Sequence, residues 1–389
     1  MWYFRSPEIV FGEGALDHLA EIGGRRALLV TDATLVGLGV AEAISSRLRA
    51  QGLVVETFAD VEPNPSLETV RAGAAAALTW APDWIVGLGG GSCLDAAKAI
   101  WILYERPDLS PDGIAPVGAL GLRRKARLIA IPTTSGTGAE TTWPIVLTDT
   151  AIGRKISVGH PECVPDVAIV DPALVRDLPA RLTADTGMDA LTHAIEGYTA
   201  QWANDFSDGL CLHAARLVFE YLPRAVALGA ADAVAREKMH NAATLAGLGF
   251  GNSMAAMAHA LGHSLGAVCH VPHGRAVGLF LPYTIAFTAR GSEEARYADV
   301  AQVLGLSCAD EAAGAAALAQ AVRDLARQIG QPLTLREAGL GEPEFEACLP
   351  HLLDNALNDG CIVMGRRYAT AEEVERLLRY AYDGREVDF

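Results

Sequence analysis

Histidine is concentrated in one short segment of the chain. The segment H-A-L-G-H-S-L-G-A-V-C-H-V-P-H-G, residues 259–274, holds four of the ten histidines among 389 residues, at positions 259, 263, 270 and 273. Imidazole is the commonest metal ligand in proteins and the side chain best suited to proton transfer near neutral pH. His259 and His263 are four residues apart, so a helix would place both rings on one face. The segment therefore predicts a metal site, a proton-transfer site or both.

A carboxylate and an imidazole have the same spacing earlier in the chain. Asp189 and His193 lie four residues apart in T-G-M-D-A-L-T-H-A-I-E-G-Y, residues 186–198. On a helix these side chains could converge on one ion, and His259, His263 and His273 could reach the same cavity. Mixed Asp and His ligands suit Fe(II) or Zn(II), whereas Ca and Mg prefer oxygen ligands. An H-E-x-x-H zinc protease is excluded, because Ala260 occupies the position of its glutamate.

A glycine-rich turn elsewhere in the chain is suited to binding phosphate. The segment W-I-V-G-L-G-G-G-S-C-L-D-A-A-K-A-I, residues 84–100, has the pattern of a buried strand, a glycine turn and a helix start. Its glycines let the backbone approach a ligand closely, and Ser92 with the free N–H groups of the helix start forms an anion site for a pyrophosphate. The strict G-x-G-x-x-G pattern fails at Ser92, and no Walker motif is present. A tight turn that only packs against the core is the alternative.

Polar residues also follow two other predicted strands. The loop I-P-T-T-S-G-T-G-A-E-T-T, residues 131–142, is rich in hydroxyl groups, and Asp32 follows the first strand in L-V-T-D-A-T. The carboxyl ends of parallel strands meet at one edge of a sheet, where such folds bind ligands, so these positions favour a dinucleotide. A carboxylate at Asp32 accepts hydrogen bonds from an adenosine ribose and repels a 2′-phosphate, which favours NAD over NADP. Capping of the following helix explains Asp32 equally well.

The elements that must position these residues fall into two halves, of which the first is α/β. Residues 1 to about 175 alternate short apolar runs with helical patterns. The predicted strands are 27–31, 54–58, 84–88, 128–131 and 167–170, and the helical patterns between the first three cover 38–51 and 66–80. The N-terminal Y-F-R-S-P and I-V-F-G predict an added hairpin or edge strand. Fully apolar strands that alternate with helices indicate a parallel, Rossmann-like sheet buried on both faces.

The second half has the pattern of an all-helical domain. After D-P-A-L-V-R-D-L-P, residues 171–179, no segment is predicted as a strand, and long Ala- and Leu-rich helical stretches follow. The last stretch opens with Thr370 and Glu373, which form a capping box. We therefore predict an α/β dinucleotide-binding domain over residues 1–178 and an all-helical metal-binding and catalytic domain over residues 179–389.

The composition argues against several classes of protein. With 31 basic and 47 acidic residues the formal charge is -16, which works against binding to nucleic acid or to an anionic membrane. No apolar run reaches the roughly 18 residues that span a bilayer, and the N-terminus lacks the pattern of a signal peptide. The seven cysteines form no C-x-x-C pair, which fits reduced thiols. We expect a cytoplasmic protein with a small-molecule substrate.

Taken together, these motifs resemble those of the iron-containing (group III) alcohol dehydrogenase family, which includes lactaldehyde reductases and propanediol dehydrogenases. The matching segments occur in the family's order over most of the chain: V-T-D (30–32), G-G-G-S-x-x-D (89–95), P-T-T-S-G-T-G-A-E (132–140), T-G-M-D-A-L-T-H-A-I-E-G-Y (186–198) and M-A-H-A-L-G-H-S-L-G-A-V-C-H-V-P-H-G (257–274). The resemblance implies a dehydroquinate synthase-like, two-domain architecture and a homo-oligomer, commonly a dimer.

The resemblance also implies a role for individual residues. The implied metal ligands are Asp189, His193, His259 and His273. His263 is then close to the nicotinamide and the substrate, as a proton relay rather than a ligand. His270, three residues before His273 in a segment predicted to be irregular, is interpreted as a rim or surface group outside the site. The implied NAD(P)-binding positions are Asp32, Gly89, Gly90, Gly91, Ser92, Asp95, Thr133, Thr134 and Lys155. The implied substrate pocket contains Trp143, Phe250 and Cys361.

The implied reaction is reversible hydride transfer between a small primary or secondary alcohol and the nicotinamide, with Fe(II) or Zn(II) polarising the substrate oxygen. A rival is a carbon-oxygen lyase similar to dehydroquinate synthase, which shares the architecture and also combines NAD with a divalent metal. Against the lyase, the helical half has no cluster of Lys, Arg and His suited to a phosphorylated sugar acid, and the first implied ligand is an aspartate. Substrate preference is the least transferable expectation, because residues 361–370 lack the family's N-P-R and Trp143-Pro144 is an unusual pair.

Overall fold

The structure is a computed structural model that describes residues 3–151, 153–292 and 294–389. The chain forms two compact units. Unit 1 comprises the chain up to Thr134 together with Gly138–Arg176, and unit 2 comprises Ser135–Thr137 together with Asp177–Phe389. The middle of the hydroxyl-rich loop therefore belongs with the helical unit, although both of its ends belong to the α/β unit.

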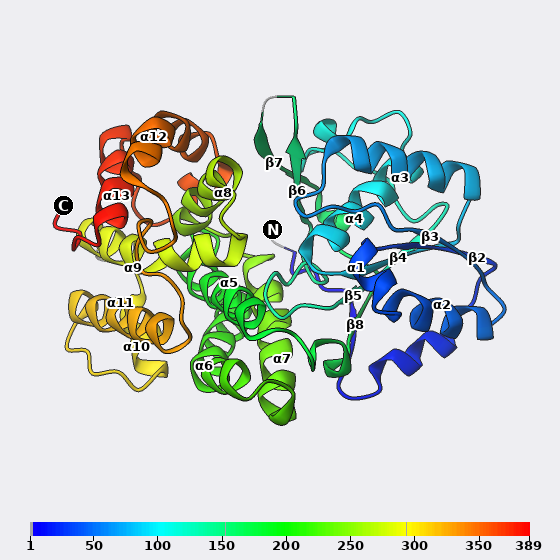
Figure 1. Ribbon diagram of the computed structural model, residues 1–389, viewed down its shortest axis with the longest axis horizontal. Coiled ribbons are helices and arrows are strands. Elements are labelled where there is room, and N and C mark those ends of the chain that lie inside the picture. The colour runs from blue at the N-terminus through cyan, green and yellow to red at the C-terminus, as the bar shows by residue number, and fades with distance from the viewer. Residues whose placement is uncertain (1–2, 152, 293) are drawn as a thin grey trace. The chain divides into compact units, whose positions relative to one another are not determined.

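Unit 1 is built on a six-stranded parallel sheet, shown in blue to green in Figure 1. In spatial order the strands are β1 (Glu8–Phe11), β8 (Val167–Val170), β5 (Arg127–Pro132), β4 (Trp84–Gly89), β2 (Arg26–Val30) and β3 (Val54–Phe58). β2 lies between two other strands, since it pairs with β3 on one side and with β4 on the other. The strand order therefore reverses between β2 and β4, and open parallel sheets bind ligands at such a point.

Helices cover both faces of this sheet. Successive residues of β2 point into two different layers: Leu28 packs with α3 and α4 on one face, and Leu29 packs with α2 and the 3-10 helix η1 on the other. The helices of unit 1 are η1 (Ala15–Glu21), α1 (Ala33–Gly37), α2 (Val40–Ala50), α3 (Leu67–Trp80), α4 (Gly91–Glu105), η2 (Pro111–Gly113), η3 (Pro161–Cys163) and η4 (Pro172–Val175). This burial on both faces explains why the strand sequences are apolar throughout.

The predicted parallel sheet is confirmed, and the five predicted strands match the observed bounds within one residue at each end. The N-terminal residues form the edge strand β1, which pairs parallel to β8, so the hairpin alternative was wrong. The helical pattern predicted over 38–51 begins at Val40, because Gly39 takes the left-handed conformation (φ 75°) and separates α2 from the short α1.

One small sheet of unit 1 was not predicted. The strands β6 (Pro144–Asp149) and β7 (Arg154–Gly159) pair in antiparallel register. Only alternate residues of β6, such as Ile145 and Leu147, are buried. A search for fully apolar runs misses a strand that buries one face only.

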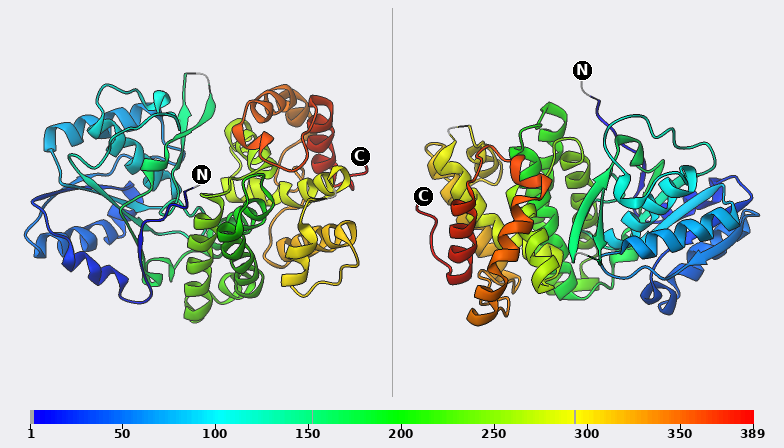
Figure 2. Two further views of the ribbon diagram at one scale, coloured as in Figure 1. Left: turned by 180° about the vertical axis from the view of Figure 1, so that it is seen from behind. Right: turned by 90° about the horizontal axis from the view of Figure 1, so that it is seen from above.

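Unit 2 consists of helices, and in its described residues no strand occurs (Figure 2). They are α5 (Ala180–Thr199), α6 (Asp205–Leu228), η5 (Gly229–Ala231), α7 (Ala233–Phe250), α8 (Met257–Cys269), α9 (His273–Gly291), α10 (Tyr297–Val303), α11 (Glu311–Gln328), α12 (Glu342–Leu357), η6 (Gly360–Val363) and α13 (Ala371–Asp383). The predicted capping box of Thr370 and Glu373 opens α13. The all-helical expectation for this half is confirmed.

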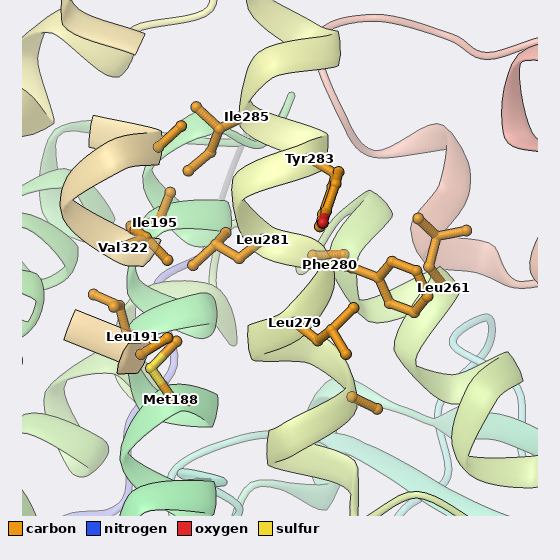
Figure 3. Close-up of a cluster of buried hydrophobic side chains, with 14 of the residues drawn as sticks. Met188, Leu191, Ile195, Leu261, Leu279, Phe280, Leu281, Tyr283, Ile285 and Val322 are labelled. Carbon is orange, nitrogen blue, oxygen red and sulfur yellow. The ribbon is translucent and has the colours of Figure 1, made fainter. Parts of the chain in front are cut away.

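The core of unit 2 is formed around α5 and α9. Figure 3 shows Leu191 and Ile195 of α5 facing Leu281 of α9, with Leu261 of α8 beside Phe280 of α9. The burial of these apolar side chains fixes the helices against each other. The same helices carry the histidines and the aspartate singled out in the sequence, so the core positions them.

Two glycines allow the close helix contacts on which this arrangement depends. A Cβ at Gly274 would lie 2.1 Å from the carbonyl oxygen of Asp185, and a Cβ at Gly262 would lie 2.5 Å from Val277. The first glycine lets the start of α9 contact α5, and the second lets α8 contact α9. Any other residue would push these helices apart. The two glycines therefore allow close packing of the three helices that carry the aspartate and the histidines.

Candidate functional site

Four side chains from three helices of unit 2 converge on one point. Asp189 and His193 lie one turn apart on α5, His259 lies near the start of α8, and His273 is the first residue of α9. The Oδ1 atom of Asp189 is 3.7 Å from Nδ1 of His193, 3.8 Å from Nε2 of His259 and 3.4 Å from Nε2 of His273. These distances are too long for hydrogen bonds, so the four groups surround a common space.

The geometry and the chemistry of these groups fit a bound metal ion. Donor atoms that each lie about 2.1 Å from one ion at tetrahedral angles are separated by about 3.4 Å. The Asp189, His193 and His259 side chains are almost fully buried, and Oδ1 of Asp189 and Nε2 of His259 have no hydrogen-bond partner in the described part of the chain. Unsatisfied polar atoms are costly when buried, and an ion coordinated by them removes that cost. One carboxylate and three imidazoles suit Fe(II) or Zn(II).

The charges within the cluster oppose one another. Burial disfavours the charged form of Asp189, but the imidazoles of His193, His273 and His259 hold the pKa of its carboxyl below the usual range. Burial lowers the pKa of His193 to about 3. Burial also disfavours the charged form of His259, but Asp189 and Glu196 outweigh it and raise its pKa to about 9. Without an ion, the cluster therefore holds its excess proton on His259.

A second histidine and carboxylate lie beside the cluster. Nδ1 of His263, one turn after His259 on α8, is 2.8 Å from Oδ2 of Asp359. The His263 ring stacks on the His273 ring, with the centroids 5.2 Å apart. The other carboxylate oxygen of Asp359 accepts a hydrogen bond from the backbone N–H of Cys361. His263 thus lies against the group of four and has a carboxylate partner of its own in Asp359.

The residues expected near the substrate have different surroundings. Phe250, at the end of α7, stacks on the His193 ring with a centroid distance of 4.0 Å. Cys361 in η6 lies with His263 and Asp359, and burial raises the pKa of its thiol well above the usual value. Trp143 belongs to unit 1, where it is half-buried and packs against the core on the α3 and α4 side of the sheet. His270, which was set aside, is exposed at the end of α8.

The glycine turn and the hydroxyl-rich loop lie side by side in unit 1. Gly89 pairs with Pro132 in the sheet, and the N–H of Thr133 donates to the carbonyl of Gly89. A Cβ at Gly90 would come within 3.3 Å of the Thr134 side chain, so glycine permits this approach. The helix α4 starts at Gly91 without a side-chain cap. Such a helix start presents backbone N–H groups and a positive dipole end, which is why the sequence predicts anion binding here.

The other expected cofactor residues lie around these loops. Asp32 follows β2 and caps α1 by accepting from the N–H of Leu35. Its second oxygen accepts a hydrogen bond from the thiol of Cys93. Asp32 therefore performs the capping role that the sequence left open, at a position beside the glycine turn, since β2 pairs with β4.

Ser92, Asp95 and Lys155 also lie in unit 1. The hydroxyl of Ser92 accepts from the N–H of Asn64. Asp95 accepts from the N–H of Val146 in β6 and pairs with the buried Lys98 at 3.4 Å. These contacts attach the β6–β7 sheet, which carries Lys155, to α4. Asp95 thus fixes neighbouring backbone.

Two carboxylates of the helical site were missed in the sequence. Glu196 lies on α5, three residues after His193, and is 2.6 Å from Nδ1 of His259. Asp359 is 96 positions away from His263 in the chain. The spacing of Glu196 from His193 on one helix face was available as a signal, whereas no local pattern pointed to Asp359.

Comparison with known proteins identifies the family. A parallel sheet with a glycine turn, joined to helices that hold an Asp/His cluster, has the parts of a metal-dependent dehydrogenase. Residues 6–172 match the family described as iron-containing alcohol dehydrogenase, and residues 183–382 match the C-terminal part of the Fe-containing alcohol dehydrogenase family. The chain belongs to the iron-containing alcohol dehydrogenase family, and it is an enzyme of alcohol and aldehyde oxidoreduction.

Relatives match over the full length. The chain is 38% identical to the NADPH-dependent butanol dehydrogenase of Clostridium saccharobutylicum over 100% of both chains. An iron-containing alcohol dehydrogenase from Thermococcus thioreducens has a similar structure, with a TM-score of 0.89 and 32% identity over 99% of this chain and 100% of the other. The sulfoacetaldehyde reductase of Bifidobacterium kashiwanohense in complex with NAD+ gives a TM-score of 0.85 and 31% identity over 98% of each chain. The rival lyase is not favoured by these matches.

The helices were also compared with the requirements of a membrane span. Within the described residues, no helix combines the length and the apolar character needed to cross a bilayer.

Proposed function

We propose that the enzyme interconverts a small primary or secondary alcohol and its aldehyde or ketone, with Fe(II) held by Asp189, His193, His259 and His273. The observation that carries the proposal is the approach of three imidazole nitrogens to within 3.4–3.8 Å of one carboxylate oxygen, in a buried cluster. Zn(II) would satisfy the same donors. When bound, the metal supplies Lewis acidity that polarises the substrate oxygen, and the nicotinamide supplies or accepts the hydride.

The residues of the chain have the remaining tasks. His263 is proposed to carry the proton of the alcohol, because its ring lies against His273 and its Nδ1 is hydrogen-bonded to Asp359. Asp359 orients that ring, as carboxylates do for catalytic histidines. Phe250 stacks on His193 and adds an apolar wall that excludes water from the cluster. Cys361 contributes a second, neutral wall, and Trp143 stays a proposed substrate contact.

We propose NAD as the preferred cofactor. The loop glycines 89–91 and Ser92 would bind the pyrophosphate at the start of α4, with Thr133, Thr134, Asp95 and Lys155 lining the same edge. Asp32 would lie near the ribose and repel a 2′-phosphate. One relative is NADPH-dependent and another was solved with NAD+, so the preference rests on Asp32. Replacing Asp32 with glycine should improve kcat/KM for NADPH relative to NADH, and an unchanged ratio would contradict the assignment.

We further propose that the enzyme is a cytoplasmic homodimer, as the family resemblance implies. Native mass measurement tests the dimer, and fractionation of the source cells tests the location. A stable monomer that is fully active would contradict the dimer.

The main test is a metal analysis of anaerobically purified protein, combined with a panel of short alcohols and aldehydes and with both NADH and NADPH. We expect about one iron per chain and steady consumption of NADH with aldehydes. The His273→Ala variant should lose both bound metal and activity. Full activity of that variant without metal would overturn the proposal. Turnover that leaves the net NADH signal unchanged would instead favour the lyase, which recycles its NAD.

A further inference from the structure

The carboxylate of Glu196 makes three hydrogen bonds to one short part of the chain. It lies on α5 and is 4% exposed. Its Oε2 atom is 2.6 Å from Nδ1 of His259 and accepts from the N–H of Ala256 at 2.8 Å. Its Oε1 atom accepts from the N–H of Ala258 at 2.5 Å. Both oxygens of a buried charge are thus satisfied by the start of α8.

These bonds fix the start of the helix that carries His259. The N-cap residue of α8, Ala256, has no side chain able to cap the helix. Free N–H groups at a helix start need an acceptor, and a negative charge there is favoured by the helix dipole. Glu196 supplies both from α5. The position of α8 relative to Asp189 and His193 is therefore set by the carboxylate on the same face of α5.

The same carboxylate selects the form of the His259 ring. When Nδ1 donates to Glu196, the proton of a neutral imidazole is on Nδ1 and the lone pair is on Nε2. Nε2 is the atom that faces Oδ1 of Asp189 at 3.8 Å. A partner on the far nitrogen fixes the tautomer and orientation of metal-ligating histidines and raises their basicity.

We propose that Glu196 is a positioning residue that holds His259 in the tautomer and orientation required for metal binding. The inference rests on the proposed ligand set, in which His259 coordinates the ion. It adds a residue that never touches the metal and acts through His259 alone. Loss of the carboxylate should weaken metal binding while the other three ligands are kept.

The test measures the Zn(II) dissociation constant by competition with a chromophoric chelator, in folded full-length protein. Glu196→Gln should bind Zn(II) about 10- to 100-fold more weakly than the parent, because an amide cannot accept from all three N–H groups. Glu196→Asp keeps the charge but is one methylene shorter, so it should recover part of that loss. A purely structural role predicts a lower Tm and an unchanged dissociation constant.

A matched control comes from the same helix. Asp185 is buried on α5, and the hydrogen bonds of its carboxylate are to Arg275 and Gln331. Asp185→Asn should lower Tm and leave the Zn(II) dissociation constant within about twofold. Parent-like binding by Glu196→Gln, while His259→Ala loses the metal, would overturn the inference alone. Retention of metal by His259→Ala would instead overturn the ligand set itself.

A separate observation concerns two thiols of unit 2. Cys269 is the last residue of α8, and Cys348 lies on α12. Their sulfur atoms are 3.6 Å apart, and both residues are half-buried. A disulfide requires about 2.05 Å, so the sulfurs would have to approach by about 1.5 Å for a bond to form. Burial, with the neighbouring Cys348, raises the pKa of Cys269 to about 12.

We infer that Cys269 and Cys348 are a modification site, where a peroxide forms a disulfide. The thiolate of one of the two cysteines attacks hydrogen peroxide and becomes a sulfenic acid as the O–O bond breaks. The thiol of the other cysteine then attacks that sulfur, and water leaves as the S–S bond forms. In total two thiols and one peroxide give one disulfide and two waters.

The experiment treats Zn(II)-loaded protein with hydrogen peroxide, blocks the remaining thiols and identifies linked peptides by mass spectrometry. We expect a Cys269–Cys348 peptide that is two hydrogens lighter than the separate thiols and that a dithiol reverses. Cys269→Ser should leave Cys348 as a trappable sulfenic acid. Cys308→Ser, a control at another half-buried cysteine, should leave the linkage unchanged. Separate alkylation of both thiols after peroxide treatment would overturn the inference.

Discussion

Two histidines that lie one turn apart on α8 each pair with a carboxylate from another part of the chain. The two pairs differ in burial and in what else the carboxylate contacts. Nδ1 of His259 is 2.6 Å from Glu196, and Nδ1 of His263 is 2.8 Å from Asp359. The first pair has side chains 3% and 5% exposed, and its carboxylate also binds the start of α8. The second pair is 10% and 12% exposed, and its carboxylate binds the N–H of Cys361.

The difference explains how one local pattern serves two tasks. A metal ligand requires a fixed ring and a lone pair directed at the ion, and the Glu196 pair provides both within the buried core. A proton relay requires a ring that gains and loses a proton and has a route to solvent, and the more exposed Asp359 pair suits that task. The spacing of four residues places both rings on one helix face, one turn apart. Both rings therefore lie at the same cluster, in different positions along the helix.

Removing one ring at a time tests whether His259 and His263 have different roles. His259→Ala removes a ligand and leaves Glu196 without its imidazole partner, so we expect loss of bound metal and a fall in kcat/KM of about a thousandfold or more. Metal content and steady-state kinetics measure the two effects. His270→Ala, at the exposed histidine of the same segment, is the control and should remain near the parent. Retained metal in His259→Ala would contradict the division of roles.

His263→Ala should separate proton transfer from metal binding. The variant is expected to keep its metal while kcat falls about 100-fold, because removal of a general acid-base group costs that order of rate. Added imidazole should restore part of kcat in this variant and none in His259→Ala. A variant that loses metal together with activity would show that His263 is a ligand, contrary to the comparison.

Sequence spacing predicted the members of the cluster that lie on one helix, and it failed where a partner comes from elsewhere. Asp189 with His193, and His259 with His263, were visible because a helix turns their i, i+4 spacing into one face. His273 was assigned as a ligand through the family resemblance, and the structure makes it the first residue of α9. Asp359 has no local relation to His263, so only the tertiary packing of η6 brings them together.

Whether a strand of the fold could be predicted from the sequence depended on how it is buried. Fully apolar strands are recognisable in sequence because a parallel sheet is buried on both faces, and β2 to β5 and β8 were found. The half-exposed β6 and β7 lack that signature, and their pairing depends on each other and on contacts such as that between Asp95 and Val146. A strand whose own residues are all apolar can be predicted from its sequence, whereas a strand that depends on pairing with another segment cannot.

The pH dependence of metal binding tests the role of His259 as a ligand. Coordination requires neutral imidazole, and the pKa of His259 is raised to about 9 in the protein without an ion. From pH 6 to 8 the ion must therefore displace a proton, so affinity should rise about tenfold per pH unit and level off above pH 9. His193, whose pKa is lowered to about 3, adds no slope in this range. Zn(II) competition at several pH values tests this, and a flat profile would contradict it.

Asp359→Asn tests the second pair at its carboxylate. The asparagine keeps the shape and can still accept from Cys361, but its amide is a weaker hydrogen-bond partner than a carboxylate for orienting the His263 ring. We expect kcat to fall about five- to tenfold, less than in His263→Ala, with the Zn(II) dissociation constant unchanged. Asp354→Asn, at an exposed carboxylate on α12, is the control. In the double variant His263→Ala, Asp359→Asn the second substitution should add no further loss, because Asp359 acts only through the ring, and an additive loss would assign it a separate task.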